Sequence, residues 1–412
     1  MLNIGSVVDL EISDVAFNGE TVAFEGDAKV FVTGAIYGER VRAEITHKRA
    51  RGYLAIVREV IEPAPTRIEH PWPLGTVNQT GAANYGHMTL TGQRAMKSRV
   101  LEGQLRQAGG DELLASFTPE MLEVRAIADA DLAAPGWRYR TRIGVNKLGG
   151  GVGMNVSRTG DHVRVDDLPL ASARINELDL FGSAWDDAVP PGEHMRLVAP
   201  SASEPVVIVG GQVLRAPGEP GEHTIAETVT YRGNDYHYEL SSGGFWQVHD
   251  NAPDALVAAV FDSLDIAEAM NVVDLYSGAG LFSLIAADLV GAKGRVRAYE
   301  GNDIATNAAR ANFAGRHWAS ADAVTINEHT IETLVEDADV VIADPPRAGL
   351  GNEAAQILAS SAASQIALVS CDSASMARDV SALVRAGREI THFHAVDIFP
   401  NTHFVETVCV VE

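Results

Sequence analysis

Short runs in which apolar and polar residues alternate fill the first sixty positions of the chain. Five of them lie within residues 5–61, and turns such as Asn18-Gly19 and Tyr37-Gly38 separate them. Alternation with a period of two is typical of a strand with one buried face. Five short strands in so short a segment predict a small barrel over residues 1–61.

A turn-rich segment follows the predicted barrel. Prolines recur between positions 63 and 73, which indicates a linker. Apolar residues then fall on one helical face from Gln93 to Gln107, and Gly109-Gly110 marks the end of this helix. We expect the helix to pack on the C-terminal domain. Because residues 120–240 have a mostly β pattern, we assign residues 62–240 to the linker and a central domain.

From about residue 241, helical stretches alternate with short apolar runs. This pattern predicts a mainly parallel sheet with helices on both faces, and therefore an α/β domain over residues 241–412. The last two runs are too close together for an intervening helix, so they predict an antiparallel hairpin. The expected strands are NVVDLY, RVRAYE, AVTIN, DVVIADPP, QIALVSC, ITHFHAVDIF and FVETVCVV.

The charge of the chain is strongly negative but unevenly spread. The formal net charge of −23 over 412 residues argues against nucleic-acid binding as a first interpretation. Residues 1–150, however, hold 17 Lys and Arg against 18 Asp and Glu. A local basic face can contact phosphates, although a solvated strand face is the alternative. The basic fourth strand and its following loop move the prediction for the barrel toward RNA, with Arg49 and Arg51 as candidate contacts. The clustered bases are Arg40, Arg42, Lys48, Arg49, Arg51 and Arg58, then Arg138, Arg140, Arg142 and Lys147.

The chain contains two cysteines, Cys371 and Cys409. This number argues against a disulfide framework and excludes a cysteine-held iron–sulfur cluster. No apolar run reaches about 18 residues, and the acidic N-terminus lacks the layout of a signal peptide. We therefore expect a cytoplasmic protein without a membrane span, and we expect a monomer.

A glycine-rich turn joins a predicted strand to a helix in DLYSGAGLFSL, residues 274–284. Gly278 and Gly280 let a ligand approach the backbone at the helix N-terminus. Glu300 ends the next strand, where a carboxylate can accept hydrogen bonds from ribose hydroxyls. The third glycine of the dinucleotide pattern is missing, which favours S-adenosylmethionine over a nicotinamide cofactor.

Two further segments begin at strand ends on the same predicted sheet edge, where ligands bind in doubly wound sheets. Asp344 opens the stiff loop of ADPPRAG, residues 343–349. Cys371 lies in VSCDSASMARD, residues 369–379, before a predicted helix whose N-terminus should lower the thiol pKa. Cys409 lies inside an apolar strand, and we interpret it as a packing residue.

An acidic residue interrupts the apolar strand in FPNTHFVETV, residues 399–408. Burial of Glu406 would raise its pKa toward that of a useful base, whereas a structural salt bridge is the alternative interpretation. The segment GGFWQVHDNA, residues 243–252, adds Gln247 as a hydrogen-bonding group and Phe245 as a residue that could stack.

In this order and spacing, the motifs F-W-Q-V, D-L-Y-S-G-A-G, D-P-P-R-A-G, S-C-D and H-F-V-E-T resemble those of the RNA uridine-5-methyltransferase family. The resemblance covers nearly the whole chain, from a TRAM-like or OB-like barrel to the C-terminus. It implies a class I S-adenosylmethionine-dependent methyltransferase domain. It also implies that the partner is RNA, either tRNA or rRNA.

The resemblance further implies roles at matching positions. Cys371 matches the nucleophile, and Glu406 matches the proton acceptor. The cofactor-site positions are matched by Gln247, Tyr276, Glu300 and Asp344, with Gly278 and Gly280 in the turn. We expect Phe245, Arg347, Arg49 and Arg51 to contact the substrate.

The sequence departs from the family pattern at several places. The segment HPWPLGTVNQTGAANYGHM lacks the cysteines that hold an iron–sulfur cluster in many members. Ser277 replaces a usual cysteine, and His249 replaces a usual asparagine. Asp372 follows the nucleophile where asparagine is usual, and we expect its charge to raise the thiol pKa.

Other functions stay open at this point. They are methylation of cytosine carbon 5 or of an exocyclic amine, a nicotinamide oxidoreductase, and a non-catalytic RNA-binding protein. Arg347 disfavours amine methylation, because such enzymes usually have an aromatic residue after Asp-Pro-Pro. Failure to bind S-adenosylmethionine would favour the oxidoreductase. An RNA-binding protein would tolerate the loss of Cys371 and Glu406.

Overall fold

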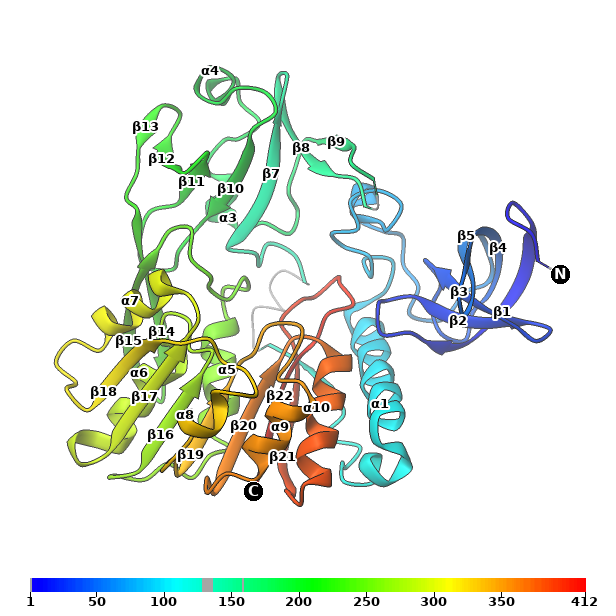
Figure 1. Ribbon diagram of the computed structural model, residues 1–412. Helices are drawn as coiled ribbons and strands as arrows, with labels where there is room; N and C mark the ends of the chain where they lie inside the picture. Colours follow the sequence, from blue (N-terminus) through cyan, green and yellow to red (C-terminus); the bar gives the residue numbers. More distant parts are fainter. Residues whose placement is uncertain (1, 128–135, 158) are drawn as a thin grey trace.

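The structure is a computed structural model that describes residues 2–127, 136–157 and 159–412. Figure 1 shows three parts: a blue barrel at the right, a green sheet at the top and an α/β layer below. A long helix lies between the barrel and the α/β layer. Within the described ranges, no helix is both long and apolar enough to cross a lipid bilayer.

The N-terminal part is a closed five-stranded barrel in the order β1-β2-β3-β5-β4, which confirms the predicted five strands. Alternate residues of β3 and β4, such as Val30, Val32, Val41 and Ile45, fill its interior. The strands are β1 (Val7–Val15), β2 (Thr21–Glu25), β3 (Ala28–Thr33), β4 (Arg40–Arg49) and β5 (Gly52–Glu62).

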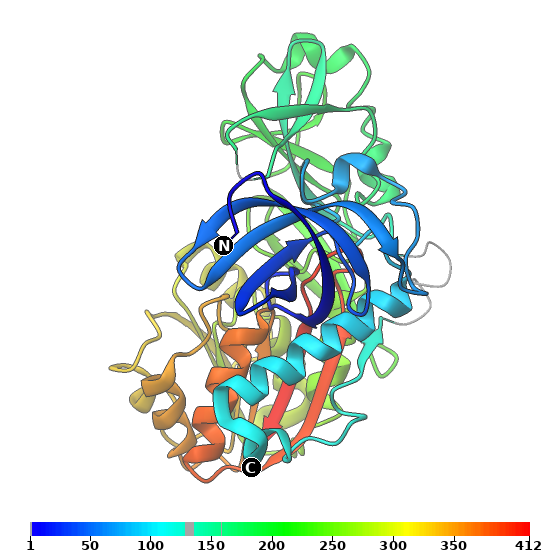
Figure 2. The same cartoon turned by 90° about the vertical axis from the view of Figure 1, so that its right-hand side faces the viewer.

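Helix α1 (Leu90–Leu114) follows the 3-10 turn η1 (Pro73–Gly75). Thr89 caps its N-terminus, because the side-chain oxygen accepts a hydrogen bond from the Gly92 N–H. The helical conformation breaks at Gly110, which has a φ of 72°, at the predicted Gly109-Gly110 stop. The apolar face of α1 packs against α10 (Ser373–Arg385) of the α/β layer. Figure 2 shows α1 passing below the barrel along this layer.

The central part is a seven-stranded sheet in the order β13-β12-β11-β10-β7-β8-β9. Its core includes the fully buried side chains of Trp185, Leu197 and Val145. The elements are β7 (Arg142–Leu148), β8 (Gly151–Asn155), β9 (His162–Val165), α3 (Ala173–Asn176), α4 (Ala184–Ala188), β10 (His194–Val198), β11 (Val206–Val209), β12 (Gln212–Ala216) and β13 (Glu219–Pro220).

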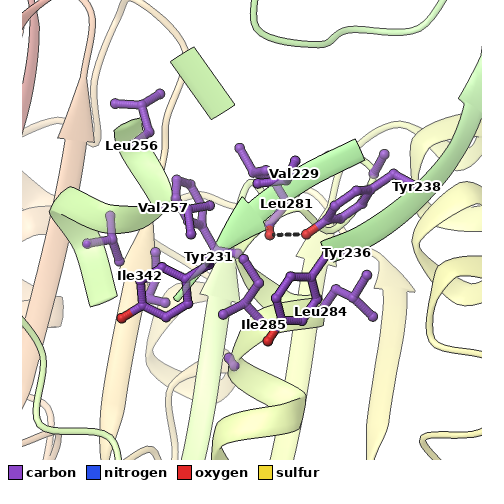
Figure 3. Close-up of a cluster of buried hydrophobic side chains, with 14 of the residues drawn as sticks. Val229, Tyr231, Tyr236, Tyr238, Leu256, Val257, Leu281, Leu284, Ile285 and Ile342 are labelled. Carbon is purple, nitrogen blue, oxygen red and sulfur yellow. Dashed lines mark hydrogen bonds between the residues drawn. The ribbon is translucent and has the colours of Figure 1, made fainter. Parts of the chain in front are cut away.

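A separate hairpin, β14 (Thr224–Tyr231) with β15 (Asn234–Ser241), packs on the α/β layer. Figure 3 shows its apolar side chains lying against Leu281 and Ile285. The Tyr238 hydroxyl donates a 2.8 Å hydrogen bond to the Leu281 carbonyl. The hairpin therefore joins the core of the C-terminal part, although it precedes the predicted domain start at residue 241.

The α/β part contains an eight-stranded sheet in the order β18-β17-β16-β19-β20-β22-β21-β6. Strands β16 to β20 are parallel, and β22 lies antiparallel between β20 and β21, which confirms the terminal hairpin. The remaining elements are β6 (Val124–Ala126), α5 (Ala252–Phe261), β16 (Asn271–Leu275), α6 (Leu281–Val290), η2 (Gly291–Lys293), β17 (Arg295–Glu300), α7 (Asp303–Asn312), β18 (Ala319–Ala323), α8 (Ile331–Leu334), β19 (Val340–Ala343), α9 (Asn352–Ala359), β20 (Gln365–Ser370), β21 (Ile390–Asp397) and β22 (Glu406–Val411).

One predicted strand is misplaced. The run AVTIN was expected to form a strand, but β18 ends at Ala323, the first residue of that run. Strand β18 instead consists of ASADA, which lacks large apolar residues because it lies at the sheet edge. Its pairing with β17, rather than its own hydrophobicity, defines it as a strand.

A buried ion pair fastens α1 to the end of this sheet. Lys97 of α1 and Asp397 of β21 are both fully buried, with 2.5 Å between Nζ and Oδ1. The ammonium group also donates a 3.0 Å hydrogen bond to the Phe399 carbonyl. Burying an unpaired charge is costly, so each partner depends on the other.

We predict that Lys97→Met lowers the free energy of unfolding by about 3–5 kcal/mol, because it leaves Asp397 buried without its cation. The Tm from scanning calorimetry measures this loss. Arg106→Met is the matched control, since Arg106 lies on the same helix in an exposed pair with Asp111. Equal effects of the two substitutions would contradict the prediction.

Candidate active site

One cavity of about 910 Å³ lies at the carboxyl edge of the α/β sheet. Segments far apart in the sequence meet there, because parallel strands end at the same edge. The cavity brings together nine of the predicted residues: Phe245, Gln247, Tyr276, Gly278, Glu300, Asp344, Arg347, Cys371 and Glu406.

The remaining predicted residues lie elsewhere. Gly280 is the N-cap of α6 behind the cavity wall, where a Cβ would lie 3.2 Å from the Phe313 ring. Arg49 and Arg51 belong to the barrel and do not line this cavity.

The glycine-rich turn after β16 has an unusual backbone. Tyr276 has a φ of 62°, which is rare for a residue with a side chain, and Gly278 has a φ of 55°. Such a conformation costs on the order of 1–3 kcal/mol and persists only when its surroundings enforce it. Among the described residues, the buried Ser277 hydroxyl has no hydrogen-bond partner. The turn therefore offers a polar atom to a ligand.

Backbone groups hold the Glu300 carboxylate at the end of β17. Gly278 N–H donates to Oε2 over 3.0 Å, and Asn302 N–H donates to Oε1 over 2.8 Å. Ile304, which is 62% exposed, and Ile326 form apolar walls beside it. The sequence motifs did not identify Asn302 or the two isoleucines, although Asn302 lies only two positions after Glu300.

Asp344 and Glu406 line the cavity, and the fully buried Asp274 lies close enough to Asp344 to affect its pKa. Burial raises the pKa of Asp274 to about 7, although the Ser283 hydroxyl donates a hydrogen bond to it. Desolvation and the neighbouring Asp274 charge raise the pKa of Asp344 to about 7. Burial, with the charge of Asp344, raises the pKa of Glu406 well above its usual range. The prediction that burial would raise the pKa of Glu406 is confirmed.

Cys371 follows β20 directly opposite the start of β22. Ser370 pairs with Thr407 in this antiparallel ladder, so the next pair of positions is Cys371 and Glu406. Burial raises the thiol pKa to about 12, and the charges of Glu406 and Asp344 add to this effect. The prediction of a lowered thiol pKa is therefore wrong: desolvation and nearby carboxylates outweigh the N-terminus of α10.

Asp372 has a structural role beside the thiol. Its side chain caps α10 by accepting hydrogen bonds from the Ala374 and Ser375 N–H groups at 3.1 and 2.9 Å. Its charge contributes less to the raised Cys371 pKa than the charges of Glu406 and Asp344. The prediction that Asp372 raises the thiol pKa is confirmed, although burial, Glu406 and Asp344 have larger effects.

Aromatic residues and Arg347 lie at the mouth of the cavity. Phe245 is 69% exposed, which is unusual for so large an apolar side chain. The Arg347 guanidinium lies over the Phe404 ring, 4.3 Å from its centroid. Phe404 was missed in the sequence, although it lies two residues before Glu406. His249 is buried and stacks on Tyr139 at 4.9 Å, so it serves in packing.

Most of the clustered bases have acidic partners. Arg42 pairs with Asp9 and Glu59, and Arg49 pairs with the buried carboxylate of Glu20. In the second cluster, the buried Arg142 and Lys147 pair with Glu227 and Asp186. Three bases differ from these: Arg140, which lines the cavity, and the exposed Lys48 and Arg51, for which no ion pair is found among the described residues. Acidic partners therefore neutralise most of the local basic face that the sequence offered.

The sheet order and the glycine-rich turn followed by Glu300 define the class I methyltransferase fold. A solved structure shares the fold: the tRNA (uracil-54, C5)-methyltransferase of Pyrococcus abyssi, in complex with S-adenosyl-L-homocysteine. The two chains align with a TM-score of 0.70 at 20% identity, covering 98% of this chain and all of the other.

Sequence comparisons identify the family. The profile of the tRNA (Uracil-5-)-methyltransferase family matches residues 221–412. An uncharacterised RNA methyltransferase of Streptomyces coelicolor is 31% identical, over 99% of this chain and 93% of its own length. A 23S rRNA (uracil(1939)-C(5))-methyltransferase of Alkalilimnicola ehrlichii is 28% identical, over 98% and 96%. The chain belongs to the RNA uracil-5-methyltransferase family.

The raised pKa of Asp274 predicts a pH-dependent stability. Its folded pKa of about 7 lies above the usual 3.8, so its contribution is complete below pH 3.8 and is lost as the pH rises toward 7. Asp274→Asn should match the wild type near pH 4 and be more stable by up to about 4 kcal/mol at pH 8. Melting curves of the ligand-free protein measure this difference. The exposed Asp265→Asn is the control, and a constant offset between wild type and Asp274→Asn would contradict the prediction.

Proposed function

We propose that this protein transfers a methyl group from S-adenosylmethionine to carbon 5 of a uridine in tRNA or rRNA, with Cys371 as the nucleophile. The observation that carries the proposal is the position of Cys371 and Glu406 on neighbouring strands within one cavity. Two similar proteins support the choice of uracil carbon 5: the enzyme of Alkalilimnicola ehrlichii for rRNA, and that of Pyrococcus abyssi for tRNA.

The cavity fits S-adenosylmethionine. Glu300, held by two backbone N–H groups, would bind the ribose hydroxyls, and Ile304 with Ile326 would cover the adenine. The unpartnered Ser277 hydroxyl offers a further hydrogen bond. The carboxyl group of Asp344, which lines the cavity, would favour a positive charge there, since a cation would lower its raised pKa. When bound, this cofactor supplies an electrophilic methyl group.

The first step is addition of Cys371 to the base. After the thiol loses its proton to water, Sγ attacks carbon 6, and the C5–C6 π electrons move through C4 onto O4 as an enolate. Carbon 5 of the base thereby becomes nucleophilic. Arg347 favours this step, because its positive charge lowers the pKa of the Cys371 thiol against the opposing carboxylates.

The second step releases the methylated base. The Glu406 carboxylate removes the proton from carbon 5, and the electron pair of that C–H bond re-forms the C5–C6 double bond as the C6–Sγ bond breaks. The raised pKa makes the ionised Glu406 a stronger base than an exposed glutamate. Its position beside Cys371 suits removal of a proton from the carbon next to the one that the thiol attacks.

The mouth of the cavity provides the contacts for an extruded base. Flipping a uridine out of an RNA stack costs a few kcal/mol, which aromatic contacts can offset. Phe245, which is 69% exposed, would stack on the uracil ring, and Gln247 in the cavity lining would hydrogen-bond its edge. On the barrel, Arg51 would contact backbone phosphates, with the partly neutralised Arg49 beside it.

We predict that the purified protein forms 5-methyluridine when it is incubated with S-adenosylmethionine and unmodified tRNA and rRNA. Mass spectrometry of the digested nucleosides identifies the product and separates it from 5-methylcytidine. Cys371→Ala should abolish turnover by at least about 10⁴-fold, because the covalent route is lost, while Cys409→Ala should not. Undiminished 5-methyluridine from the Cys371→Ala protein would refute the proposed nucleophile.

Glu406→Gln separates the two halves of the reaction. The amide cannot accept the carbon-5 proton, so the methylated base should stay attached to Cys371. Denaturing electrophoresis of the Glu406→Gln protein incubated with labelled RNA and cofactor should show a slow-moving band. This band should be absent from the double variant that also carries Cys371→Ala. Normal product release from the Glu406→Gln protein would exclude Glu406 as the base.

A further inference from the structure

The loop that joins β21 to β22, residues 398–405, leads into Glu406, the proposed proton acceptor. Glu406 is the first residue of β22, where it pairs with Val396 of β21, and the loop leads directly into it from the other side. The same loop places Phe404 under the Arg347 guanidinium. A shift of the loop would move Phe404 and the entry into β22 relative to Cys371, which follows a different strand, β20.

Asn401, in the middle of this loop, is fixed through both its backbone and its side chain. It is 3% exposed and has a φ of 63°, in the left-handed region. Its side chain accepts a hydrogen bond from Gln93 Nε2 over 2.9 Å and donates one to the Gly136 carbonyl over 2.6 Å. Its backbone N–H donates to Gln93 Oε1 over 2.7 Å, and its carbonyl accepts from Tyr85 N–H over 2.9 Å.

Gln93 of α1 is the partner on the other side of this contact. Its amide is fully buried, and it both accepts from and donates to Asn401. Nε2 also donates to the Met88 carbonyl over 3.0 Å. Because the bonds are reciprocal, a carboxylate or an apolar side chain at this position cannot replace the amide. The contact joins residues 308 positions apart in the chain.

Neighbouring contacts hold the rest of the loop to other parts of the protein. Lys97, one helical turn after Gln93, binds Asp397 and the Phe399 carbonyl. The Tyr139 hydroxyl donates to the Pro400 carbonyl over 3.1 Å. The Lys97 contacts already hold α1 to the sheet. The hydrogen bonds of Asn401, whose backbone is left-handed, are an additional constraint on the loop. Strained backbone of this kind gathers where a precise position matters.

We infer that Gln93 and Asn401 form an amide clamp that positions Glu406 for removal of the carbon-5 proton, an inference that rests on the proposed function. Neither residue lines the cavity, so both act through the loop. Loosening the clamp would free the loop that leads into Glu406, while Cys371 stays fixed directly after β20. The clamp therefore acts mainly on the second half of the reaction, in which Glu406 removes the proton.

Gln93→Leu tests the clamp, with Gln107→Leu as the matched control on the exposed face of the same helix. We expect kcat of Gln93→Leu to fall by at least about tenfold, since a displacement of 1 Å can cost on the order of 100-fold. KM for RNA should change by less than about twofold, because no substrate contact is removed. The covalent RNA–protein species should accumulate, as in Glu406→Gln, which loss of structure alone would not produce.

Asn401→Gly is the second variant, and it serves also if Gln93→Leu fails to fold. Glycine keeps the positive φ and the backbone hydrogen bonds but removes the side-chain bonds of the clamp. It should show the same low kcat and the same accumulation of adduct. Wild-type kcat in both variants, or a parallel loss of turnover and adduct formation, would overturn the inference. Absence of 5-methyluridine from the wild type would instead refute the proposed function itself.

Discussion

The insertion of β22 between β20 and β21 is the constraint on which the site depends. Strand β22 runs antiparallel to β20. The start of β22 therefore lies beside the end of β20, where Cys371 follows. This register brings Glu406 next to Cys371 without any long connecting element. It also requires a loop, residues 398–405, whose conformation is not fixed by sheet hydrogen bonds. Contacts from α1, from the segment before it and from the central part hold the loop in place instead.

The electrostatics of the cavity follow from this crowding. Asp274, Asp344, Glu406 and the Cys371 thiol all favour their protonated forms, because burial and mutual repulsion penalise ionisation. A cationic ligand reverses this balance for the carboxyl groups. We therefore view the ligand-free protein as one whose thiol is protected from unwanted reactions. The carboxyl groups and the thiol become chemically useful together, when the cofactor and the target uridine are bound.

The sequence was sufficient where local pattern determines structure. Alternation predicted the barrel strands, and the strand ends carrying Asp344 and Cys371 placed both residues at one sheet edge. Prediction from the sequence failed where residues distant in the chain determine a property. The pKa of Cys371 depends on carboxylates that only folding brings near, and Arg42 and Arg142 are neutralised by partners on other strands. The β14–β15 hairpin and the edge strand β6 likewise owe their positions to packing and to long-range pairing.

The most direct test of the covalent mechanism uses RNA that contains 5-fluorouridine. Carbon 5 then carries fluorine, so Glu406 has no proton to remove and the reaction stops after methyl transfer. We predict that the wild-type protein becomes covalently linked to this RNA in the presence of S-adenosylmethionine. Mass spectrometry after protease and nuclease digestion should find the methylated base on the peptide that contains Cys371. No adduct, or an adduct on Cys409, would contradict the account.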